Sequence, residues 1–282
     1  MNYRHAYHAG NHADVLKHVV LLAIIDALKR KETPFCVVDT HAGRGQYLLQ
    51  GEQASATGEA AAGIFRLYVL HGLPGVVQAY LRRVQADNPV GALVTYPGSP
   101  LLVAQAMRAQ DRLFACELHP EEARALGTLF RDDKRVTVMA RDGYAAVKAL
   151  VPPQERRGLV LVDPPYEAQD DEFPKVLAAL RDGLERWPTG CYAVWYPIKR
   201  ARSLAPFFRK VAALPCKSAL RAELLVRPDD SALRLNGSGM LVINPPWTLA
   251  ADLAPALPVL ARLLGDREPS SQLDWIKKED GA

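Results

Sequence analysis

The chain has 282 residues, of which 49% are hydrophobic, and its 35 basic and 31 acidic side chains give a net charge of +4 at pH 7. These values are ordinary for a globular protein with one large domain or a domain with an insertion, and the charge is a weak indication of nucleic-acid binding. No apolar run approaches the ~20 residues of a membrane helix, and the polar N-terminus does not resemble a signal peptide. A cytoplasmic protein is therefore expected. The cysteines are scattered, which favours buried free thiols over a disulfide or a zinc site.

The N-terminal segment gathers aromatic, basic and imidazole side chains, among them Tyr3 and Arg4. A helix is expected from about residue 13 to residue 30, because its apolar positions follow the helical period, and His18 lies beside that apolar stripe. The histidines form no recognised ligand spacing, so a metal site is not predicted. From the residues alone, surface or capping histidines explain the segment. A contact with cofactor and RNA is added only by the family resemblance described below.

A strand is expected over residues 35–39, and the loop after it carries His41, Gly43 and Gly45. An aspartate followed by this Gly-x-Gly has the form of the cofactor loop of methyltransferases. Glycines permit a tight turn whose backbone can approach a ligand, and exposed N–H groups suit the carboxylate of S-adenosylmethionine. Taken alone, the pattern fits an ordinary turn equally well. It lacks the third glycine of a dinucleotide fingerprint and the lysine of a P-loop, which argues against a dehydrogenase and an NTPase.

The alternation of strands and helices pauses between residues 47 and 95. Helical patterns are expected over residues 57–69 and 76–84. A parallel crossover needs only about a dozen residues, so residues 47–95 are interpreted as a small helical subdomain inserted into a main domain of residues 1–46 and 96–282. Structural cover and a clamp on the substrate are both open as its role.

Three further polar residues stand where α/β folds bind cofactors. Ser99 is expected to cap a helix that begins at Pro100, a role that explains it fully and is compatible with holding the polar end of a cofactor. Glu117 follows a strand, where a carboxylate can accept hydrogen bonds from two ribose hydroxyls. Asp142, followed by Gly143, ends the next strand, where it can accept a bond from an adenine amine. Each acid alone is more typical of a loop residue or a helix cap.

The motif Asp163-Pro164-Pro165-Tyr166 directly follows residues 158–162, an apolar run that predicts a buried strand. The prolines end the strand, because they have no N–H to donate, and they hold the residue before them extended. An acid, two rigid carbonyls and an aromatic ring are typical of amino-methyltransferases, which methylate exocyclic amines with S-adenosylmethionine. The glycine loop and the two acids also follow strands, so a parallel sheet would gather all four signatures at one edge.

A second copy of the pattern, Asn244-Pro245-Pro246-Trp247, lies further along the chain. Two strand-like runs, residues 220–226 and 240–243, precede it and are joined by a glycine-containing turn, which predicts a hairpin. The second strand of a hairpin runs antiparallel, so its end lies at the opposite edge of the sheet. Trp247 is therefore expected away from the cofactor, and the first motif is expected to be the catalytic one.

The segment from Lys199 to Arg227 contains eight basic residues and one acid, Glu223, which is a local net charge of +7. A solvated helix face and a phosphate-contacting patch both explain such a run. The patch is favoured, because the segment follows a strand, residues 191–197, that should end at the catalytic edge of the sheet.

Motifs along nearly the whole chain resemble those of the RlmJ family, bacterial enzymes that methylate N6 of one adenine in large-subunit ribosomal RNA. The matching motifs are Tyr3-Arg4-His5, the run from His8 to His18, Asp39-Thr40-His41-Ala42-Gly43, Tyr96-Pro97-Gly98-Ser99-Pro100, Glu117-Leu118-His119-Pro120, Asp163-Pro164-Pro165-Tyr166 and Asn244-Pro245-Pro246-Trp247. The resemblance implies an α/β, Rossmann-like class I methyltransferase fold. Its sheet would be seven-stranded and mainly parallel, with an antiparallel C-terminal hairpin strand and a small helical insertion.

The family pattern also implies roles for individual residues. The residues expected to contact the cofactor S-adenosylmethionine or lie beside it are His18, His41, Gly43, Ser99, Glu117, Asp142, Gly143 and Asp163. Asp163 is also the implied catalytic acid/base position, with Pro164 and Tyr166 as its catalytic neighbours. Tyr3, Arg4 and Tyr166 are expected to touch the substrate, 23S rRNA. No metal and no membrane are expected as partners, and a monomer is expected.

The expected reaction is direct methyl transfer from S-adenosylmethionine to N6 of a specific adenine in 23S rRNA. Asp163 and the Pro164 carbonyl would accept hydrogen bonds from the amine and aim its lone pair at the methyl group, and Tyr166 would stack on the base. Two alternatives stay open: a DNA adenine-N6 methyltransferase with the same chemistry, and a non-catalytic RNA-binding protein that keeps the fold.

Overall fold

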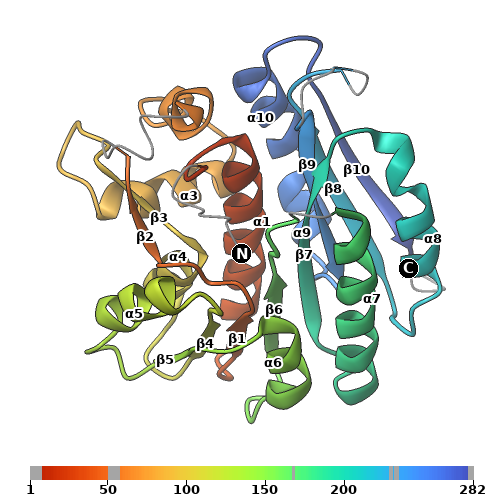
Figure 1. The fold of residues 1–282 in the computed structure, drawn as a ribbon. Helices are drawn as coiled ribbons and strands as arrows, with labels where there is room; N and C mark the ends of the chain where they lie inside the picture. The colour runs from red at the N-terminus through yellow and green to blue at the C-terminus, as the bar shows by residue number, and fades with distance from the viewer. Residues whose placement is uncertain (1–7, 50–57, 167–168, 229–230, 232–234, 279–282) are drawn as a thin grey trace.

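An eight-stranded sheet forms the centre of the protein in the computed structural model, which describes residues 8–49, 58–166, 169–228, 231 and 235–278 (Figure 1). The strands lie in the order β10-β8-β9-β7-β6-β1-β4-β5. Their bounds are β1 Cys36–Asp39, β4 Arg112–Cys116, β5 Val136–Met139, β6 Gly158–Val162, β7 Cys191–Ile198, β8 Ala219–Leu225, β9 Gly237–Ile243 and β10 Ser270–Lys277. The strands from β5 to β7 are parallel, whereas β9 runs antiparallel to both β7 and β8, and β10 runs antiparallel to β8.

This order confirms the expected Rossmann-like α/β fold and its antiparallel C-terminal hairpin. The expected number of seven strands is wrong by one, because β10 adds an antiparallel strand at the edge next to β8. Along β10 exposed and half-buried side chains follow one another, and none is fully buried. Such a segment carries a weak local pattern, and its pairing with β8 makes it a strand.

Helices cover both faces of the sheet. They are α1 His12–Lys29, α3 Gly75–Ala86, α4 Ser99–Ala106, α5 Pro120–Leu129, α6 Gly143–Leu150, α7 Gln169–Arg186, α8 Ala205–Ala212, α9 Leu249–Leu253 and α10 Ala256–Leu264. In β6, Leu159 and Leu161 belong to a core with α1, α3, α4 and α10, while Val160 and Val162 belong to a second core with α6, α7 and α8. A strand buried on both faces has a continuous apolar sequence, which explains why β6 could be predicted. None of the described helices is long and apolar enough to span a membrane.

The helix α1 is enclosed by the rest of the protein over most of its length. Asn11 caps it by accepting the N–H groups of Ala13 and Asp14, and every residue from His12 to Ile25 is buried. The helix lies along the sheet and contacts α3, α4, α9 and β9 (Figure 1). A helix that is buried all round must pair its charged side chains, because an unpaired buried charge is costly.

The inserted segment contains less helix than expected. Its described elements are β2 Gln46–Leu48, η2 Glu59–Ala62, η3 Ile64–Arg66, α3 and β3 Thr95–Pro97, of which β2 and β3 pair antiparallel. The second expected helix is present as α3, but the first is replaced by the two 3₁₀ turns η2 and η3. The chain breaks at Gly63, where a Cβ atom would collide with the Gly10 carbonyl oxygen, and the Ile64 N–H donates to that same oxygen at 2.8 Å. The contact of Gly63 and Ile64 with Gly10, just before α1, thus outweighs the helix propensity of this segment. The start of the expected pattern at Thr57 lies outside the described residues, and a separate subdomain of residues 47–95 stays a prediction.

The second Pro-Pro motif lies at the amino edge of the parallel strands, as expected, because β9 ends beside the start of β7. The Asn244 amide donates to the carbonyls of Pro188 and Gly190, both at 2.9 Å, and its oxygen accepts a backbone N–H at 3.1 Å. Trp247 is 88% exposed, and the Arg30 guanidinium lies 5.7 Å from the centre of its ring. Asn244 therefore joins loops at this edge, far from the carboxyl ends of the strands.

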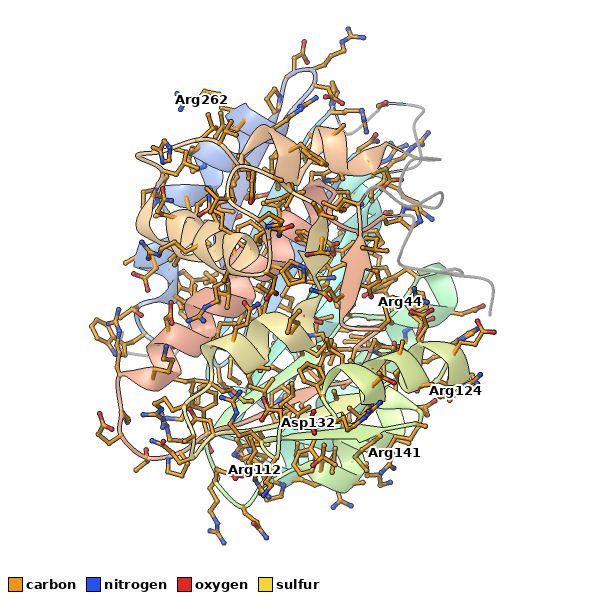
Figure 2. The ribbon with its side chains drawn as sticks, turned by 90° about the vertical axis from the view of Figure 1, so that its left-hand side faces the viewer. Arg44, Arg112, Arg124, Asp132, Arg141 and Arg262 are labelled. Carbon is orange, nitrogen blue, oxygen red and sulfur yellow. The ribbon has the colours of Figure 1, made fainter. Side chains whose placement is uncertain are left out.

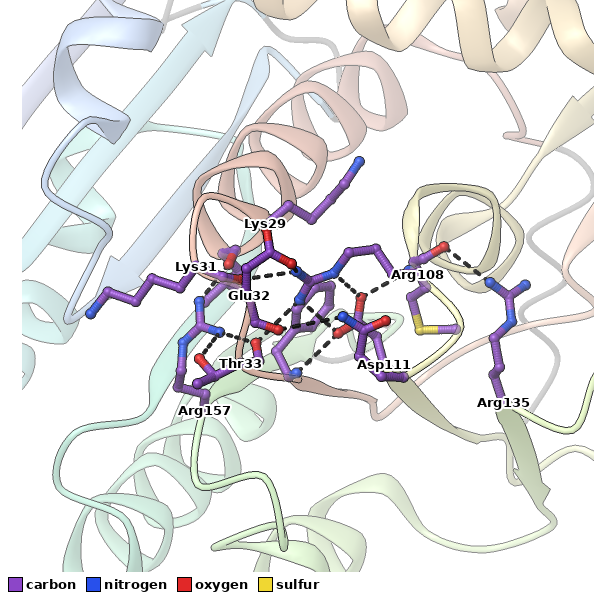
Figure 3. Close-up of polar contacts among 12 residues, drawn as sticks. Lys29, Lys31, Glu32, Thr33, Arg108, Asp111, Arg135 and Arg157 are labelled. Atoms are coloured by element: carbon purple, nitrogen blue, oxygen red, sulfur yellow. Dashed lines mark hydrogen bonds and ion pairs between the residues drawn. The ribbon is translucent and has the colours of Figure 1, made fainter.

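Arginine side chains hold the turn between α1 and β1 at the same edge (Figure 3). Arg108 binds the fully buried Asp111 at 2.9 Å and donates to the carbonyls of Lys31 at 2.9 Å and Thr33 at 3.1 Å. Arg157 donates to the Thr33 hydroxyl at 2.9 Å. These contacts fix where α1 ends, and with it the position of the rest of the helix along the sheet.

Candidate active site

A cavity of about 500 Å³ opens at the carboxyl edge of the parallel strands. Small-molecule sites typically have volumes of about 300–1,000 Å³. The walls come from α1, from the segments after β1, β4, β5 and β6, and from the end of β7. The predicted site residues that line it are His18, His41, Gly43, Ser99, Glu117, Asp142, Gly143, Asp163, Pro164 and Tyr166. Tyr3 and Arg4 lie outside the described residues.

The glycine loop after β1 has the backbone that its sequence predicts. Gly43 and Gly45 have φ angles of 60° and 85°, a region that favours glycine, and a Cβ atom on Gly43 would collide with the Tyr47 hydroxyl. Glu117 accepts the Gly43 N–H at 2.9 Å and the His119 N–H at 2.7 Å, one with each carboxylate oxygen. The carboxylate thus joins the loops after β1 and β4 and keeps lone pairs for further donors.

Ser99 does not cap a helix, contrary to expectation. Gly98 is the N-cap of α4, and the Ser99 hydroxyl donates to Asp39 Oδ2 at 2.6 Å. Asp39 is fully buried at the end of β1, and this burial raises its pKa to about 7, against the lowering effect of the Ser99 hydrogen bond. Ser99 therefore holds the acid that begins the glycine loop. A partner 60 residues away in the chain gives no local signal.

Asp142 combines the two roles that its sequence left open. Its carboxylate caps α6 by accepting the Ala145 N–H at 2.9 Å, and it also lines the cavity. Gly143 is required beside it, because a Cβ atom there would collide with the Thr40 carbonyl oxygen. The cap fixes the acid at the cavity wall, and the glycine lets α6 approach the loop after β1.

An aromatic wall that the sequence did not reveal adjoins His41. The Tyr144 ring lies edge-on to the His41 ring at 5.2 Å, and its hydroxyl donates to Glu172 of α7 at 2.7 Å. Burial lowers the pKa of His41 below that of a free imidazole. His18 of α1, which also lines the cavity, is fully buried, with its Nδ1 2.8 Å from the Tyr96 hydroxyl.

The buried ion pair between Lys17 and Asp163 is the feature of the site that sequence reasoning missed. Lys17 Nζ lies 2.5 Å from Asp163 Oδ2 and 2.8 Å from Asp14 Oδ1, and its side chain is 5% exposed. Burial alone would favour the neutral amine, but Asp14 and Asp163 raise the pKa of Lys17 above its ordinary value. The three side chains together carry a net charge of −1. Asp163 Oδ1 accepts no hydrogen bond from any residue that the structure describes, and Asp163 lines the cavity.

A signal for this pair was present in the sequence. Asp14 and Lys17 are spaced i,i+3 within a helix that is apolar around most of its circumference. Charges in such a helix need partners, and the acid at the end of β6 is the partner that supplies the second ion pair.

Tyr166 is more enclosed than a freely stacking ring. It is 6% exposed, its hydroxyl donates to the Trp195 carbonyl at 3.0 Å, and the rings of Phe173 and Trp195 lie 5.4 and 5.6 Å away. Its φ of 48° turns the chain back after the two prolines. The ring still lines the cavity beside Asp163.

The fold divides the basic segment into two parts. Arg221 is paired with Asp274 of β10 at 2.8 Å, and Arg227 is paired with Asp266 at 2.8 Å. Both acids lie outside the segment, so the local charge of +7 overstates the free positive charge. Lys199, in contrast, is exposed and lines the cavity.

The polar groups around the cavity are carboxylates, imidazoles, ammonium groups, hydroxyls and backbone groups. Among the described residues no group of three His, Cys, Asp or Glu side chains is arranged to hold a metal ion. The four cysteines are buried free thiols.

Arg44 of the glycine loop forms a two-point contact with Glu122 of α5, at 2.8 and 2.9 Å. Arg44, Arg124 and Arg141 lie along the same side of the molecule in Figure 2.

The sheet order, the reversed strand β9 and the cavity at the carboxyl ends of β1, β4, β5 and β6 define a class I, Rossmann-like methyltransferase fold. Comparison with known proteins agrees at a finer level. A family model described as "Ribosomal RNA large subunit methyltransferase D, RlmJ" matches residues 32–277, and the chain belongs to this family.

Relatives match the chain from end to end. Ribosomal RNA large subunit methyltransferase J of Haemophilus influenzae is 43% identical over 281 residues, which is 99% of this chain and 100% of that protein. The protein of the same name from Escherichia coli is 41% identical over 280 residues, with the same coverage. A crystal structure of a Legionella pneumophila protein, 32% identical, has a TM-score of 0.87 and covers 95% of this chain and 98% of its own.

Proposed function

We propose that the protein transfers a methyl group from S-adenosylmethionine to N6 of one adenine in large-subunit (23S) ribosomal RNA. The observation that carries the proposal is the Asp163 motif at the cavity, with one carboxylate oxygen bound by Lys17 and the other open to a substrate amine. The names of the relatives, which are ribosomal RNA large subunit methyltransferases, support RNA as the substrate. Such a substrate would place the enzyme in the cytoplasm, as expected from the sequence.

The residues around the cavity fit S-adenosylmethionine. Glu117 has lone pairs for ribose hydroxyls, Asp142 has an acceptor for the adenine amine, and the glycines at positions 43 and 143 permit the close packing that brings the loop after β1 and the start of α6 to the cavity wall. His41 and Ser99 line the same space. When bound, the cofactor supplies an electrophilic methyl group next to a positively charged sulfur.

The Asp163 motif then acts by positioning. An adenine amine is a poor nucleophile, because its lone pair is delocalised into the ring. Hydrogen bonds from the amine to Asp163 Oδ1 and to the Pro164 carbonyl would orient that lone pair, and holding such a geometry can contribute several kcal/mol. The carboxylate also stabilises the positive charge that develops on the amine.

Lys17 and Asp14 prepare this carboxylate for its role. The ammonium fixes Asp163 Oδ2 and leaves Oδ1 to the substrate, while Asp14 keeps the three charges at a net −1. A net negative charge suits an amine that becomes cationic as it is methylated. A paired adenine would first have to leave its stack to reach the site.

Asp163→Ala tests the proposal. The variant should lose methyl transfer to a 23S rRNA fragment while it keeps its circular dichroism spectrum and still binds S-adenosylmethionine in calorimetry. Near-normal methylation by this variant would contradict the role of Asp163. Matched RNA and DNA fragments, given to the wild-type protein, separate an RNA from a DNA methyltransferase, since the 2′-hydroxyl distinguishes them. A wild-type protein that binds RNA without S-adenosylmethionine would instead be a non-catalytic binding protein.

A further inference from the structure

The loop of residues 199–202, called the basic loop below, carries positive charge next to the cavity. It follows β7 directly, and its first residue, Lys199, lines the cavity. Lys199, Arg200 and Arg202 are all exposed, and none of them forms an ion pair with a residue that the structure describes. The basic loop therefore differs from Arg221 and Arg227, whose charges are neutralised by acids of the C-terminal segment.

The backbone of the basic loop is held in place, whereas the side chains of Lys199, Arg200 and Arg202 form no ion pair with a described residue. The fully buried Asn236 donates to the Lys199 carbonyl at 2.8 Å, and the Ser203 hydroxyl donates to the Arg200 carbonyl at 2.7 Å. Leu204, at the end of the short helix η4 Ala201–Leu204, is 1% exposed within the second core. A charged loop on a fixed backbone loses little conformational entropy when it binds a ligand.

Acids and lysines both line the cavity. The acids are Asp14, Glu117, Glu122, Asp142, Asp163 and Glu172. Of the lysines, Lys17 is paired with Asp14 and Asp163, and Lys175 with Glu172, whereas Lys199 of the basic loop forms no ion pair with a described residue. Acids suit hydroxyl and amine donors, whereas free arginines suit phosphate oxygens, which they bind with two parallel hydrogen bonds. A nucleotide presents both kinds of group, with its base and sugar on one side and its phosphate on the other.

We propose that the basic loop binds the phosphate groups of the RNA strand next to the nucleotide that enters the cavity. This rests on the proposed function, since it assigns a second contact to the same RNA substrate. Arg200 and Arg202 hold the flanking phosphates and Lys199 holds the phosphate nearest the cavity. The loop thus fixes the strand while the target base lies against the Asp163 motif.

The test compares two double variants with the same loss of charge. Arg200→Gln/Arg202→Gln removes both arginines of the basic loop. Arg209→Gln/Lys210→Gln removes two exposed basic residues of α8, which lie close in sequence but do not line the cavity. Binding of a single-stranded 23S rRNA fragment is measured at several salt concentrations, together with kcat and KM for methylation and with S-adenosylmethionine binding by calorimetry.

The basic-loop variant should lower the slope of log Kd against log salt by about 1.4 and weaken RNA binding about 25-fold at 0.1 M salt, as expected for two lost phosphate contacts. Its KM for RNA should rise, with kcat and S-adenosylmethionine binding unchanged, and the α8 variant should behave as wild type. Unchanged RNA binding in the basic-loop variant, or an equal loss in both variants, overturns the inference. The wild-type protein is assayed in parallel: if it binds RNA through the loop but does not methylate it, the proposed function fails and the binding site stands.

Discussion

Two segments of this protein share one pattern, a short polar residue followed by two prolines and an aromatic ring, and they lie at opposite edges of the same sheet. The Asp163 motif follows β6, which runs parallel to its neighbours, and its ring, Tyr166, is 6% exposed. The Asn244 motif follows β9, which runs antiparallel, and its ring, Trp247, is 88% exposed. Strand direction thus decides which copy meets the cavity.

The first residues of the two motifs are used in opposite ways. The amide nitrogen and oxygen of Asn244 form hydrogen bonds with three backbone groups, so this residue holds loops together. Within the described part of the chain, Asp163 is bound by the ammonium group of Lys17 alone, and its Oδ1 accepts no hydrogen bond. The motif therefore has a structural role where all its polar atoms form hydrogen bonds. It is suited to bind a substrate where one polar atom lacks a partner next to a cavity.

Exchanging the polar residues of the two motifs should have the largest effect. Asp163→Asn removes the charge that stabilises the developing cation, and methyl transfer should fall by about 10²–10⁴-fold. Asn244→Asp should leave the activity per folded molecule unchanged but lower the free energy of unfolding by about 1–3 kcal/mol, since a carboxylate would face the carbonyls of Pro188 and Gly190. Methylation assays and urea denaturation of both variants check this. Loss of activity from the Asn244 variant alone would reverse the assignment of the two motifs.

Lys17→Met should have the next largest effect, because it leaves Asp14 and Asp163 buried without their cation. Breaking such a pair costs about 3–5 kcal/mol of unfolding free energy, and methyl transfer should fall with the loss of the fixed carboxylate. The matched control is Lys29→Met at the other end of α1, where the ion pair to Asp26 is longer, 3.5 Å, and partly exposed. That variant should change stability by no more than about 0.5 kcal/mol. Equal effects in the two variants would contradict the role given to Lys17.

A pH-dependent effect should come from Asp39 at the carboxyl edge. Its folded pKa of about 7 lies above the usual value for an aspartate, so the folded protein holds a proton that the unfolded chain loses near pH 4. This contribution to stability is complete below pH 4 and is lost as the pH rises to 7, on the order of 4 kcal/mol at most. Asp39→Asn keeps an acceptor for Ser99 but cannot titrate, so its unfolding free energy should lack this decline. Identical pH profiles of the wild type and the variant would show that Asp39 does not contribute.

Trp247→Ala should have the smallest effect. The ring is largely exposed, and its Arg30 contact lies at the amino edge. Its removal should change the unfolding free energy by about 0.5 kcal/mol or less and leave methylation unchanged. A marked loss of RNA methylation would mean that the amino edge also meets the substrate.

Much of the fold followed from local sequence. The run of β6 is apolar because both of its faces are buried, and the hairpin before Asn244 predicts the direction of β9 and so the place of Trp247. The glycine loop, Glu117, Asp142 and the Asp163 motif could be proposed because each follows a strand at the same edge, whereas His18 of α1 was expected only from the family resemblance. These features depend on a few neighbouring residues, which is why sequence patterns report them.

The features that could not be predicted depend on residues far apart in the chain. Lys17 and Asp163 are separated by 146 positions, and Ser99 and Asp39 by 60. The local sequence predicted Ser99 as a helix cap, but its hydroxyl donates a hydrogen bond to Asp39, the buried acid at the end of β1. The 3₁₀ turns around Gly63 likewise arise from contact with Gly10. For Ser99 and for the turns around Gly63, tertiary contacts outweighed the conformation that the local sequence favours.

The enclosure of α1 has a consequence for how the chain is made. The helix ends at Lys29 and packs against β9, which is complete only at Ile243. At a synthesis rate of about 5–20 residues per second, roughly 10–40 s pass between the synthesis of α1 and the completion of β9. During that time the part of its apolar surface that β9 covers in the folded protein stays exposed, and exposed apolar surface is what chaperones bind. Asp163 is made before β9, so its ion pair with Lys17 can form before α1 is fully enclosed.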